Sequence, residues 1–329
     1  MKIAVLFGGT SSERDVSVAS GAQVVEALRT LGHEVVAVDA SRGALAQNDE
    51  ATVLGGQVGR LPPEEIVSAD ALAPQILQDE SLADADLFFL TLHGGSGEDG
   101  TVQAVLEREG IRYTGSDSRG SALAMDKDAA KRRFIEADVQ TAPWLMAPAS
   151  SDDVERELGY PVIVKPNAEG STVGLTLVNG PSELAPAIEL ASRFDERVML
   201  ERYIPGRELT VGILGDAALA AGEIIPDSGG IFDYAAKYQA EGTTKIFPAE
   251  LSESDTARIR ACALAAHRSL GLQSYSRVDF RMDPDGNFWC LEINTLPGLS
   301  PSSLLPKSAK VYGIGFAELC EKICLAARP

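Results

Sequence analysis

Three oxygen-bearing side chains and one guanidinium lie within a short stretch near the C-terminus. Arg277 and Asp279 stand two residues apart in a run where apolar and polar residues alternate. Glu292 and Asn294 have the same spacing in a second such run, and the turn-forming residues 283–287 separate the runs, so the pattern predicts a β-hairpin. Side chains two residues apart share one face of a strand, so all four converge if the hairpin pairs in register. A few hard oxygen ligands of this kind suit Mg²⁺ that also holds substrate phosphates.

The alternative is a solvated hairpin face that carries ordinary charges. It explains any one of these residues taken alone. It explains poorly the combination of Asp279, Glu292 and Asn294 beside the irregular, proline- and glycine-bearing residues 295–298. A metal site is therefore the preferred interpretation of the set.

Two lysines and a glycine-bearing loop suggest a grip on phosphate. Lys165 ends an apolar run, where a charged side chain is costly unless it is paired, and a phosphate is a natural partner. Lys127 could act in the same way, although a surface lysine on a helix is the simpler explanation of that residue. Residues 169–174 combine glycines and hydroxyls in the manner of a loop whose backbone N–H groups face phosphate oxygens, and a plain hairpin turn is the alternative.

A possible adenosine site lies further along the chain. Glu201 ends a predicted strand and precedes the linker-like residues 202–206, with Glu208 just beyond. Backbone groups at such a junction could bind adenine, while the two carboxylates take ribose hydroxyls or an amino group.

A competing nucleotide motif occurs at residues 95–100, which match GxGxxG between a strand and a helix. This match alone would suggest an NAD-linked oxidoreductase. Glu98 and Asp99 argue against it, because they would place negative charge beside a pyrophosphate. The motif also follows the third predicted strand rather than the first. A GxxxxGK[ST] phosphate loop is absent from the sequence.

The bulk properties narrow the class of protein. A chain of 329 residues is long enough for two or three domains. Its net charge of −19 argues against a nucleic-acid surface, and its apolar runs fall short of the roughly 20 residues of a membrane span. The chain begins directly with a strand, so no signal peptide is expected. Four scattered cysteines are expected to be reduced thiols in a cytoplasmic protein.

Alternating strands and helices open the chain. Strand 2–7, helix 16–31 and strand 35–39 form a predicted βαβ unit, which implies a parallel sheet. A helical segment is expected at about 118–137. Strands and helices of an α+β type follow, with a long loop through 226–248 and final helix 313–327 as the last features.

Four motifs together resemble those of the ATP-grasp enzymes and, more narrowly, of the D-alanine–D-alanine ligase family. They are residues 8–17, 93–100, 234–238 and 292–298, and the resemblance extends over essentially the whole chain. It implies an α/β and α+β fold with three-domain ATP-grasp architecture. The expected domains are an N-terminal Rossmann-like parallel-sheet domain (1–116), a central small domain (117–206) and a C-terminal domain with the metal site and a mobile loop (207–329).

The resemblance also implies an activity. The family joins two D-alanine molecules with ATP and two Mg²⁺ ions, or Mn²⁺ in their place, through an acyl phosphate, and the product feeds peptidoglycan synthesis. Members are often homodimers. Neither a nucleic acid nor a membrane is an expected partner.

Site residues carry over by position. Lys127 and Lys165 would hold ATP phosphates, with Glu201 and Glu208 near adenosine. The metal ligands would be Asp279, Glu292 and Asn294. Glu13 would take the ammonium of the first D-alanine near His93, and Arg277 with the Gly298 N–H would face the oxyanion. Ser303 and Lys237 would contact the second D-alanine or a phosphate. Tyr238 would bind Ser171 and Glu13 when the site closes.

Some positions depart from the family pattern. Ala235 stands where an acid is usual, and Ser302 stands where some members have histidine. Both border the expected second-substrate pocket, so a ligase that uses D-lactate competes with the dipeptide enzyme. Two further rivals are another ATP-dependent carboxylate–amine ligase and a non-catalytic nucleotide-binding module.

Overall fold

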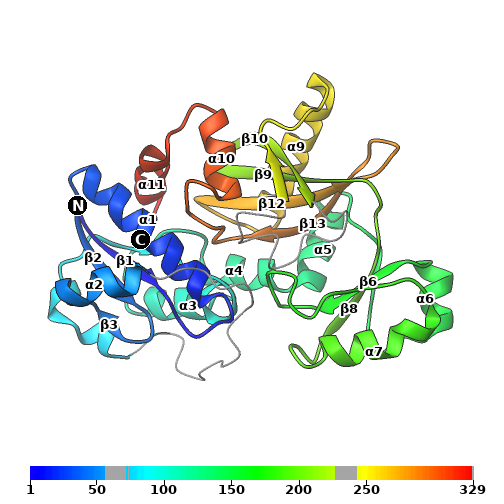
Figure 1. Ribbon diagram of the computed structural model, residues 1–329, viewed down its shortest axis with the longest axis horizontal. Helices are drawn as coiled ribbons and strands as arrows, with labels where there is room; N and C mark the ends of the chain where they lie inside the picture. Colours follow the sequence, from blue (N-terminus) through cyan, green and yellow to red (C-terminus); the bar gives the residue numbers. More distant parts are fainter. Residues whose placement is uncertain (56–71, 73, 227–242, 328–329) are drawn as a thin grey trace.

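Three β-sheets organise the described residues of the protein, as a computed structural model shows (Figure 1). The structure describes residues 1–55, 72, 74–226 and 243–327. One sheet is largely parallel and two are antiparallel, so the expected combination of α/β and α+β elements is confirmed. Lys237, Tyr238 and Ala235 fall between 226 and 243, so the predictions for these residues lie outside the described part of the chain.

The N-terminal sheet contains the predicted βαβ unit. Strand β1 (Lys2–Phe7) pairs in parallel with β2 (Glu34–Asp39) and β4 (Leu87–Leu90), and helix α1 (Arg14–Thr30) connects β1 to β2. Such strands are buried on both faces, which explains their nearly continuous apolar sequence. The chain leaves β1 and β4 at the same edge, where polar loops of an open parallel sheet usually form a binding site.

Short elements complete this lobe around the sheet. They are β3 (Gly43–Ala44), α2 (Gln47–Leu54), η1 (Pro74–Gln78), η2 (Glu80–Leu82), η3 (Gly95–Gly97) and α3 (Thr101–Arg108).

A five-stranded antiparallel sheet in the order β11-β10-β9-β12-β13 forms the middle of the molecule. Helix α9 (Glu253–Ser269) packs on one face, where Val211 and Val278 are buried. Helix α10 (Leu304–Val311) packs near the other face, which carries Thr210. The strands are β9 (Arg207–Leu214), β10 (Ala217–Pro226), β11 (Thr243–Ile246), β12 (Tyr275–Met282) and β13 (Phe288–Asn294).

The third sheet has the order β5-β8-β6-β7 and lies on the right of Figure 1. Its elements are β5 (Trp144–Met146), α6 (Ser151–Glu157), β6 (Val162–Pro166), β7 (Thr176–Val178), α7 (Pro181–Ala191) and β8 (Val198–Arg202). One apolar cluster joins its strands to α6 and α7.

The helical segment expected at about 118–137 is two helices, α4 (Ser118–Met125) and α5 (Lys127–Glu136). Asp126 interrupts the segment with extended backbone, and its carboxylate accepts a hydrogen bond from the Ala129 N–H. Aspartate favours this N-cap position because it satisfies an otherwise unpaired donor of the first turn. The interruption makes Lys127 the first residue of α5.

The C-terminal part also differs from the prediction. Helix α11 (Phe316–Leu325) is shorter than the expected helix 313–327, and α10 before it was not predicted. Pro306 suggests a helix break, but it lies in the first turn of α10, where a missing N–H is tolerated. Strand β11 occupies part of the loop expected at 226–248.

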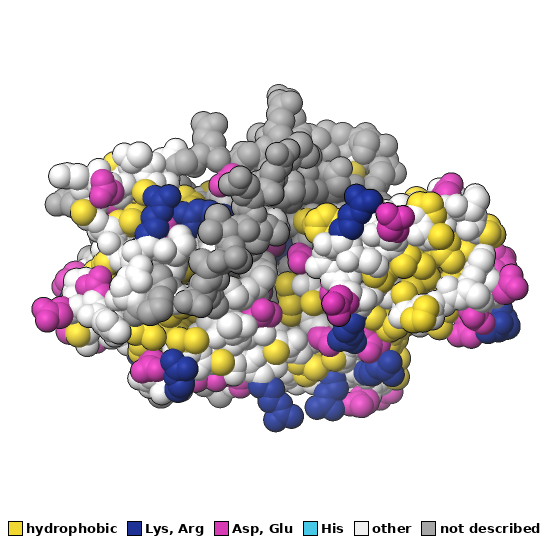
Figure 2. Space-filling model, turned by 90° about the horizontal axis from the view of Figure 1, so that it is seen from below, with side chains coloured by type: hydrophobic (Ala, Val, Ile, Leu, Met, Phe, Trp, Pro, Cys, Tyr) yellow, Lys and Arg dark blue, Asp and Glu magenta, His cyan; other side chains and the backbone are white. Residues whose placement is uncertain are grey.

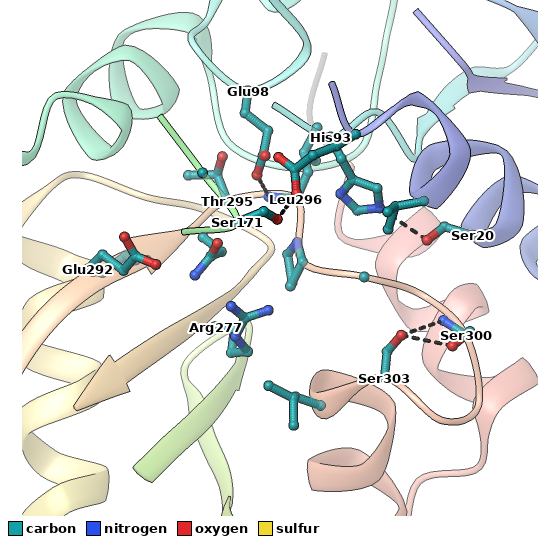
Figure 3. A pocket seen from close by; sticks show the side chains of 18 of the residues that line it. Ser20, His93, Glu98, Ser171, Arg277, Glu292, Thr295, Leu296, Ser300 and Ser303 are labelled. Atoms are coloured by element: carbon teal, nitrogen blue, oxygen red, sulfur yellow. Dashed lines mark hydrogen bonds between the residues drawn. The ribbon is translucent and has the colours of Figure 1, made fainter. Parts of the chain in front are cut away.

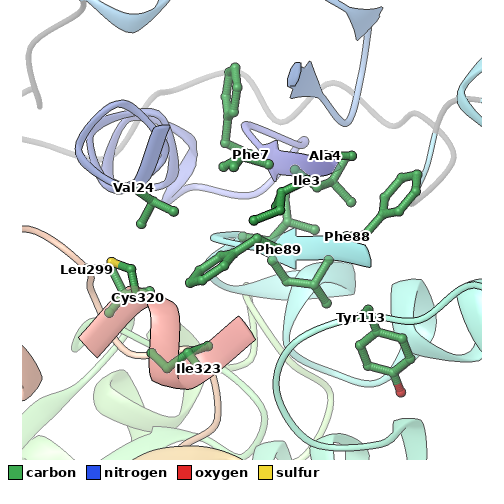
Figure 4. Close-up of a cluster of buried hydrophobic side chains, with 14 of the residues drawn as sticks. Ile3, Ala4, Phe7, Val24, Phe88, Phe89, Tyr113, Leu299, Cys320 and Ile323 are labelled. Atoms are coloured by element: carbon green, nitrogen blue, oxygen red, sulfur yellow. The ribbon is translucent and has the colours of Figure 1, made fainter. Parts of the chain in front are cut away.

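The core of the N-terminal lobe is completed from the other end of the chain. Cys320 and Ile323 on α11 are fully buried in one cluster with Ile3, Val24 and residues of β4 (Figure 4). Helices α4 and α5 likewise bury Ala124 and Phe134 in the cluster under the middle sheet. Side chains from beyond both expected domain boundaries therefore enter neighbouring cores, and the division at 116 and 206 stays a prediction.

None of the helices in the described ranges has the length and apolar character that crossing a bilayer requires. On the face shown in Figure 2, the basic side chains of the described residues are scattered among acidic ones. A nucleic-acid surface would collect them in a patch or stripe.

Candidate active site

A cavity of about 520 Å³ lies between the polar edge of the N-terminal sheet and the middle sheet (Figure 3). Its lining includes Glu13 and His93 from the first lobe and Arg277 and Glu292 from the hairpin, with Ser171 from the central loop. Residues far apart in the sequence thus converge on one space. The predicted site residues that line it are Glu13, His93, Lys127, Ser171, Arg277, Glu292, Asn294, Gly298 and Ser303.

Glu13 and Ser171 join two lobes across this cavity. Both side chains are buried, and the Ser171 hydroxyl donates a hydrogen bond to the Glu13 carboxylate. Two glycines lie close to this contact: a Cβ at Gly94 would lie 2.7 Å from Glu13 Oε2 and a Cβ at Gly170 would lie 2.9 Å from it, so either would displace the carboxylate. The carboxylate is therefore held in a tight cradle, facing a cavity in which it could accept hydrogen bonds from an ammonium group.

His93 is a buried neutral imidazole beside Glu13. Burial lowers the pKa of His93 below its ordinary value, and the opposing influence of Glu13 does not restore it. Its Nε2 lies 3.0 Å from the Ser20 hydroxyl, and the same Ser20 Oγ accepts a hydrogen bond of 3.2 Å from the Leu299 N–H. His93 is thus connected through α1 to the loop that carries Gly298.

Glu98, which sequence reasoning used only as an argument against a dinucleotide, holds the same loop from its other side. Its Oε2 accepts from the Gly94 N–H at 2.7 Å, and its Oε1 accepts from the Leu296 N–H at 3.3 Å (Figure 3). Ser20 and Glu98 therefore hold the backbone on both sides of Gly298. The sequence around Glu98 did not predict this role, because its partner Leu296 lies in another lobe.

Replacing Glu98 with glutamine should remove a pH dependence of stability. Burial, and then the Glu13 charge, raises the pKa of Glu98 to about 7 from an ordinary 4.5. The native state therefore keeps a proton that the unfolded chain releases, and the stability this proton contributes is lost as the pH rises from about 4.5 through 7. The wild-type protein should lose on the order of 2 kcal/mol relative to the Glu98→Gln variant across this interval.

Urea denaturation at about pH 5 and about pH 8 measures this difference. Glu155→Gln, at an exposed position of α6, is the matched control. It should leave the change in the free energy of unfolding between the two pH values unaltered. If the free energy of unfolding changed equally with pH in the wild type and in Glu98→Gln, Glu98 would not hold the proton.

The predicted hairpin forms, with an irregularity in the pairing between Asp279 and Phe280. Asp279 lies opposite Glu292, and Arg277 lies opposite Asn294. Arg277 Nε and Nη2 donate to the two Asp279 oxygens at 2.9 and 2.7 Å. Asn294 Nδ2 donates to Asp279 Oδ2 at 3.0 Å, and the Thr210 hydroxyl donates to Oδ1 at 2.7 Å. The expected convergence of the guanidinium and the three oxygen-bearing side chains is confirmed.

The donor set fits a metal ion that arrives with a phosphate. Among the described residues, no group of three or more His, Cys, Asp and Glu side chains is placed to hold a metal. The hairpin offers two carboxylates and an amide, with Asp279 already bonded to Arg277 and Asn294. Mg²⁺ commonly takes one or two protein carboxylates and completes its shell with water and substrate phosphates. The residues therefore fit Mg²⁺ bound together with a nucleotide.

A second cavity, of about 130 Å³, adjoins the first. Lys165, Glu201 and Glu208 line it, with Tyr203 and Ile204 from the linker between β8 and β9. The predicted adenosine and phosphate residues are thus brought together. Lys165 Nζ lies 2.7 Å from Glu201 Oε2, and Glu208 Oε2 lies 3.5 Å from Arg281 Nη1.

The two cavities share one wall. Lys127, Glu169, Gly170, Ser171 and Glu292 line both of them. Lys127 Nζ donates to the Glu169 carbonyl at 2.6 Å and lies 3.4 Å from Glu292 Oε2. A group bound in one cavity can therefore meet a group bound in the other beside a lysine and a carboxylate.

Ser303 is the N-cap residue of α10 and lines the larger cavity. Its hydroxyl accepts from the Ser300 N–H at 3.2 Å and lies 2.8 Å from Ser300 Oγ (Figure 3). A Cβ at Gly298 would lie 3.0 Å from Ser303 Oγ, so these residues are in close contact. Ser302 lines the same cavity.

The GxGxxG match is not a dinucleotide site. Residues 95–97 form a short 3-10 turn, and Asp99 Oδ1 accepts from the Thr101 N–H at 2.8 Å, at the start of α3. A carboxylate thus occupies the helix N-terminus that a pyrophosphate would need.

Comparisons with known proteins agree over the length of the chain. Residues 2–116 match the family model described as "D-ala D-ala ligase N-terminus", and residues 135–325 match "D-ala D-ala ligase C-terminus". A D-alanine–D-alanine ligase of Geobacter sulfurreducens is 43% identical over 329 residues, covering 99% of this chain and 94% of the relative. One from Halalkalibacterium halodurans is 39% identical, covering 98% and 97%.

Solved structures are similar as well. VanG D-Ala:D-Ser ligase from Enterococcus faecalis has a TM-score of 0.81 at 30% identity, with 99% of this chain and 98% of that chain covered. A D-alanine–D-alanine ligase from Bacillus anthracis complexed with ATP has a TM-score of 0.75 at 29% identity, with 99% and 96% covered.

Proposed function

This chain belongs to the D-alanine–D-alanine ligase family, and from that premise we propose how its two cavities join two D-alanine molecules with ATP. The smaller cavity takes the nucleotide, and the larger takes the two amino acids. The wall that they share carries the proposal, because a phosphate donor and a carboxylate acceptor must meet at one place. The products are D-alanyl-D-alanine, ADP and phosphate.

The first D-alanine is activated at the shared wall. Its ammonium group binds Glu13, whose carboxylate is held by Ser171 and lies beside the neutral His93. Its carboxylate then attacks the terminal phosphorus of ATP, the bond from that phosphorus to its bridging oxygen breaks, ADP leaves, and the carboxylate becomes an acyl phosphate. A carboxylate is a poor acceptor for an amine, and this step supplies it with a good leaving group. Lys127 lies where it can bind the transferring phosphate.

The second D-alanine attacks the acyl phosphate through its amine. The C–N bond forms, and a negatively charged oxygen develops on the carbonyl carbon. The C–O bond to the phosphate then breaks, and the phosphate departs with one former carboxylate oxygen and the proton that the amine nitrogen releases. Arg277 and the Gly298 N–H stabilise the negatively charged oxygen. The positions of Ser20 and Glu98 support the role of Gly298, because they hold the backbone on both sides of it. Ser303 contacts the second D-alanine.

The remaining assignments belong to the same proposal. Lys165 and Ser171 bind ATP phosphates, and Glu201 and Glu208 bind adenosine. Asp279, Glu292 and Asn294 would hold two Mg²⁺ ions, with Mn²⁺ as a substitute, and bound ions would neutralise phosphate charge during transfer. Lys237 and Tyr238, outside the described residues, contribute to phosphate binding and to closure over the site.

The cellular context completes the proposal. The three domains are 1–116, 117–206 and 207–329, and the protein is a cytoplasmic homodimer that supplies peptidoglycan synthesis. The two family matches, over residues 2–116 and 135–325, support the boundary at 116, and family membership supports the role in peptidoglycan synthesis.

A panel of amino acids tests the reaction. Phosphate release from ATP with Mg²⁺ should require D-alanine, and the product should have the mass of D-alanyl-D-alanine. D-Serine, D-lactate and L-alanine belong in the panel, because a D-Ala:D-Ser ligase is among the similar structures and Ser302 lines the larger cavity. ATP binding without D-alanine-dependent phosphate release would instead indicate a nucleotide-binding module, and an amide or ester formed only with another substrate would indicate a different ligase.

A further inference from the structure

A fully buried lysine behind the smaller cavity takes no part in the proposed reaction. Lys131 lies on α5, has 0% of its surface exposed and lines neither cavity. Its Nζ donates to Thr141 Oγ1 at 2.6 Å and to the Ala142 carbonyl at 2.9 Å, and lies 2.6 Å from Glu201 Oε1. Burial lowers the pKa of Lys131 and the Glu201 charge opposes that shift. Two of these oxygens accept hydrogen bonds from Lys131, and the third belongs to the carboxylate of Glu201.

Glu201 is shared between two lysines. Lys131 contacts one carboxylate oxygen, and Lys165 donates to the other at 2.7 Å. Burial alone would raise the pKa of Glu201, but the two lysines outweigh it, and the pKa lies below its ordinary value. The carboxylate is therefore ionised. Within this three-residue cluster two lysines face one carboxylate, so Lys131 still pairs with Glu201 if Lys165 turns toward an anion in the smaller cavity.

The two lysines differ in where they can move. Lys165 lines the cavity and can turn toward an anion there. Lys131 is enclosed, because Thr141, Ala142 and Glu201 hold its amino group and the Trp144 ring lies 5.2 Å away. Thr141 is itself fixed, since its hydroxyl donates to the Cys290 carbonyl at 2.6 Å.

We propose that Lys131 is a positioning residue for the nucleotide phosphates, which retains Glu201 so that Lys165 can leave this carboxylate and bind a phosphate oxygen. Without Lys131, the departure of Lys165 would leave the buried Glu201 carboxylate without a cationic partner, so Lys165 would remain bound to Glu201. With Lys131 in place, the carboxylate keeps one partner throughout. The inference rests on the proposed function, in which the anion is the phosphate chain of ATP.

The Lys131→Met variant tests this in the full-length protein. Calorimetry should show that its affinity for ATP is about tenfold weaker than that of the wild type. Its affinity for adenosine, which has no phosphate for Lys165 to bind, should change by less than about twofold. Arg133→Met is the matched control: Arg133 is two residues further along α5, pairs with Glu136 at the surface, and should affect neither ligand.

A second background separates action through Glu201 from general loosening of the structure. In the Glu201→Gln variant there is no carboxylate to leave unpaired, so adding Lys131→Met should weaken ATP binding by less than about threefold. If Lys131→Met does not fold, Thr141→Val removes one acceptor of the Lys131 ammonium and should weaken ATP binding in the same direction, by about threefold.

Three results would overturn the inference: wild-type ATP affinity in a folded Lys131→Met protein, an equal loss for adenosine, or the full loss in the Glu201→Gln background. Unchanged ATP affinity in Thr141→Val would do so if Lys131→Met does not fold. Binding needs no D-alanine, so a wild-type protein that binds ATP without D-alanine-dependent phosphate release would refute the proposed function alone. A wild type that does not bind ATP would refute both.

Discussion

Replacing Arg277 with methionine is expected to lower kcat by about 10³-fold while the protein stays folded. Arg277 projects into the larger cavity, where the negatively charged oxygen of the tetrahedral intermediate would develop. Two donors of its guanidinium are fixed by Asp279, so the positive charge is in position before the reaction begins. Such a preorganised charge stabilises the transition state more than the bound substrate, and its loss should appear in kcat.

The matched control is Arg207→Met. Arg207 makes a two-point ion pair with Glu223 on the same sheet, at 2.7 and 2.6 Å, but lines neither cavity. This variant loses a similar pair and should keep its kcat within about threefold. The KM for ATP should be nearly unchanged in Arg277→Met. A kcat for Arg277→Met within about fivefold of the wild-type value, measured by phosphate release, would contradict the assignment.

Replacing Glu292 with glutamine is expected to reduce turnover by about 10³-fold and to raise the Mg²⁺ concentration needed for half-maximal activity. The side chain keeps its size but loses the charge that a divalent ion requires. Glu292 lies opposite Asp279 and lines both cavities, so it is placed where the two substrates meet. Lys127 Nζ, 3.4 Å from its carboxylate, would lose an ionic partner as well.

Asp285→Asn is the control for this substitution. It removes one carboxylate from the same hairpin, at the exposed turn. Its Mg²⁺ dependence should match that of the wild type. A second readout is nucleotide binding at increasing Mg²⁺, in which Glu292→Gln should need more metal. An unaltered Mg²⁺ dependence in that variant would remove Glu292 from the metal site.

The hairpin was predictable because its information is local. Period-two alternation assigns Arg277 and Asp279 to one face, and the intervening turn determines which strand they meet. The parallel sheet of the N-terminal lobe was predictable for the same reason, since a strand, a helix and a strand follow one another directly. The division between α4 and α5 was missed, because helix-forming residues on both sides of Asp126 hide a cap.

Residues whose partners are distant in the sequence were missed. Lys131 stands in a charged helical segment and resembles a surface lysine, yet Glu201, which explains its burial, is seventy residues further on. Glu98 acts on Leu296, in a loop of another lobe. Helix α11 completes the core under β1 although it is last in the chain. Contacts of this kind depend on how the lobes pack together, so no local sequence pattern predicts them.

The most direct test of the proposed mechanism follows an oxygen atom. D-Alanine labelled with oxygen-18 in its carboxylate is supplied with ATP and Mg²⁺, and the released phosphate is analysed by mass spectrometry. If the carboxylate attacks ATP and the amine then expels phosphate, each phosphate carries one labelled oxygen from D-alanine. Released phosphate without the label, alongside formation of the dipeptide, would contradict activation by phosphoryl transfer at the wall that the two cavities share.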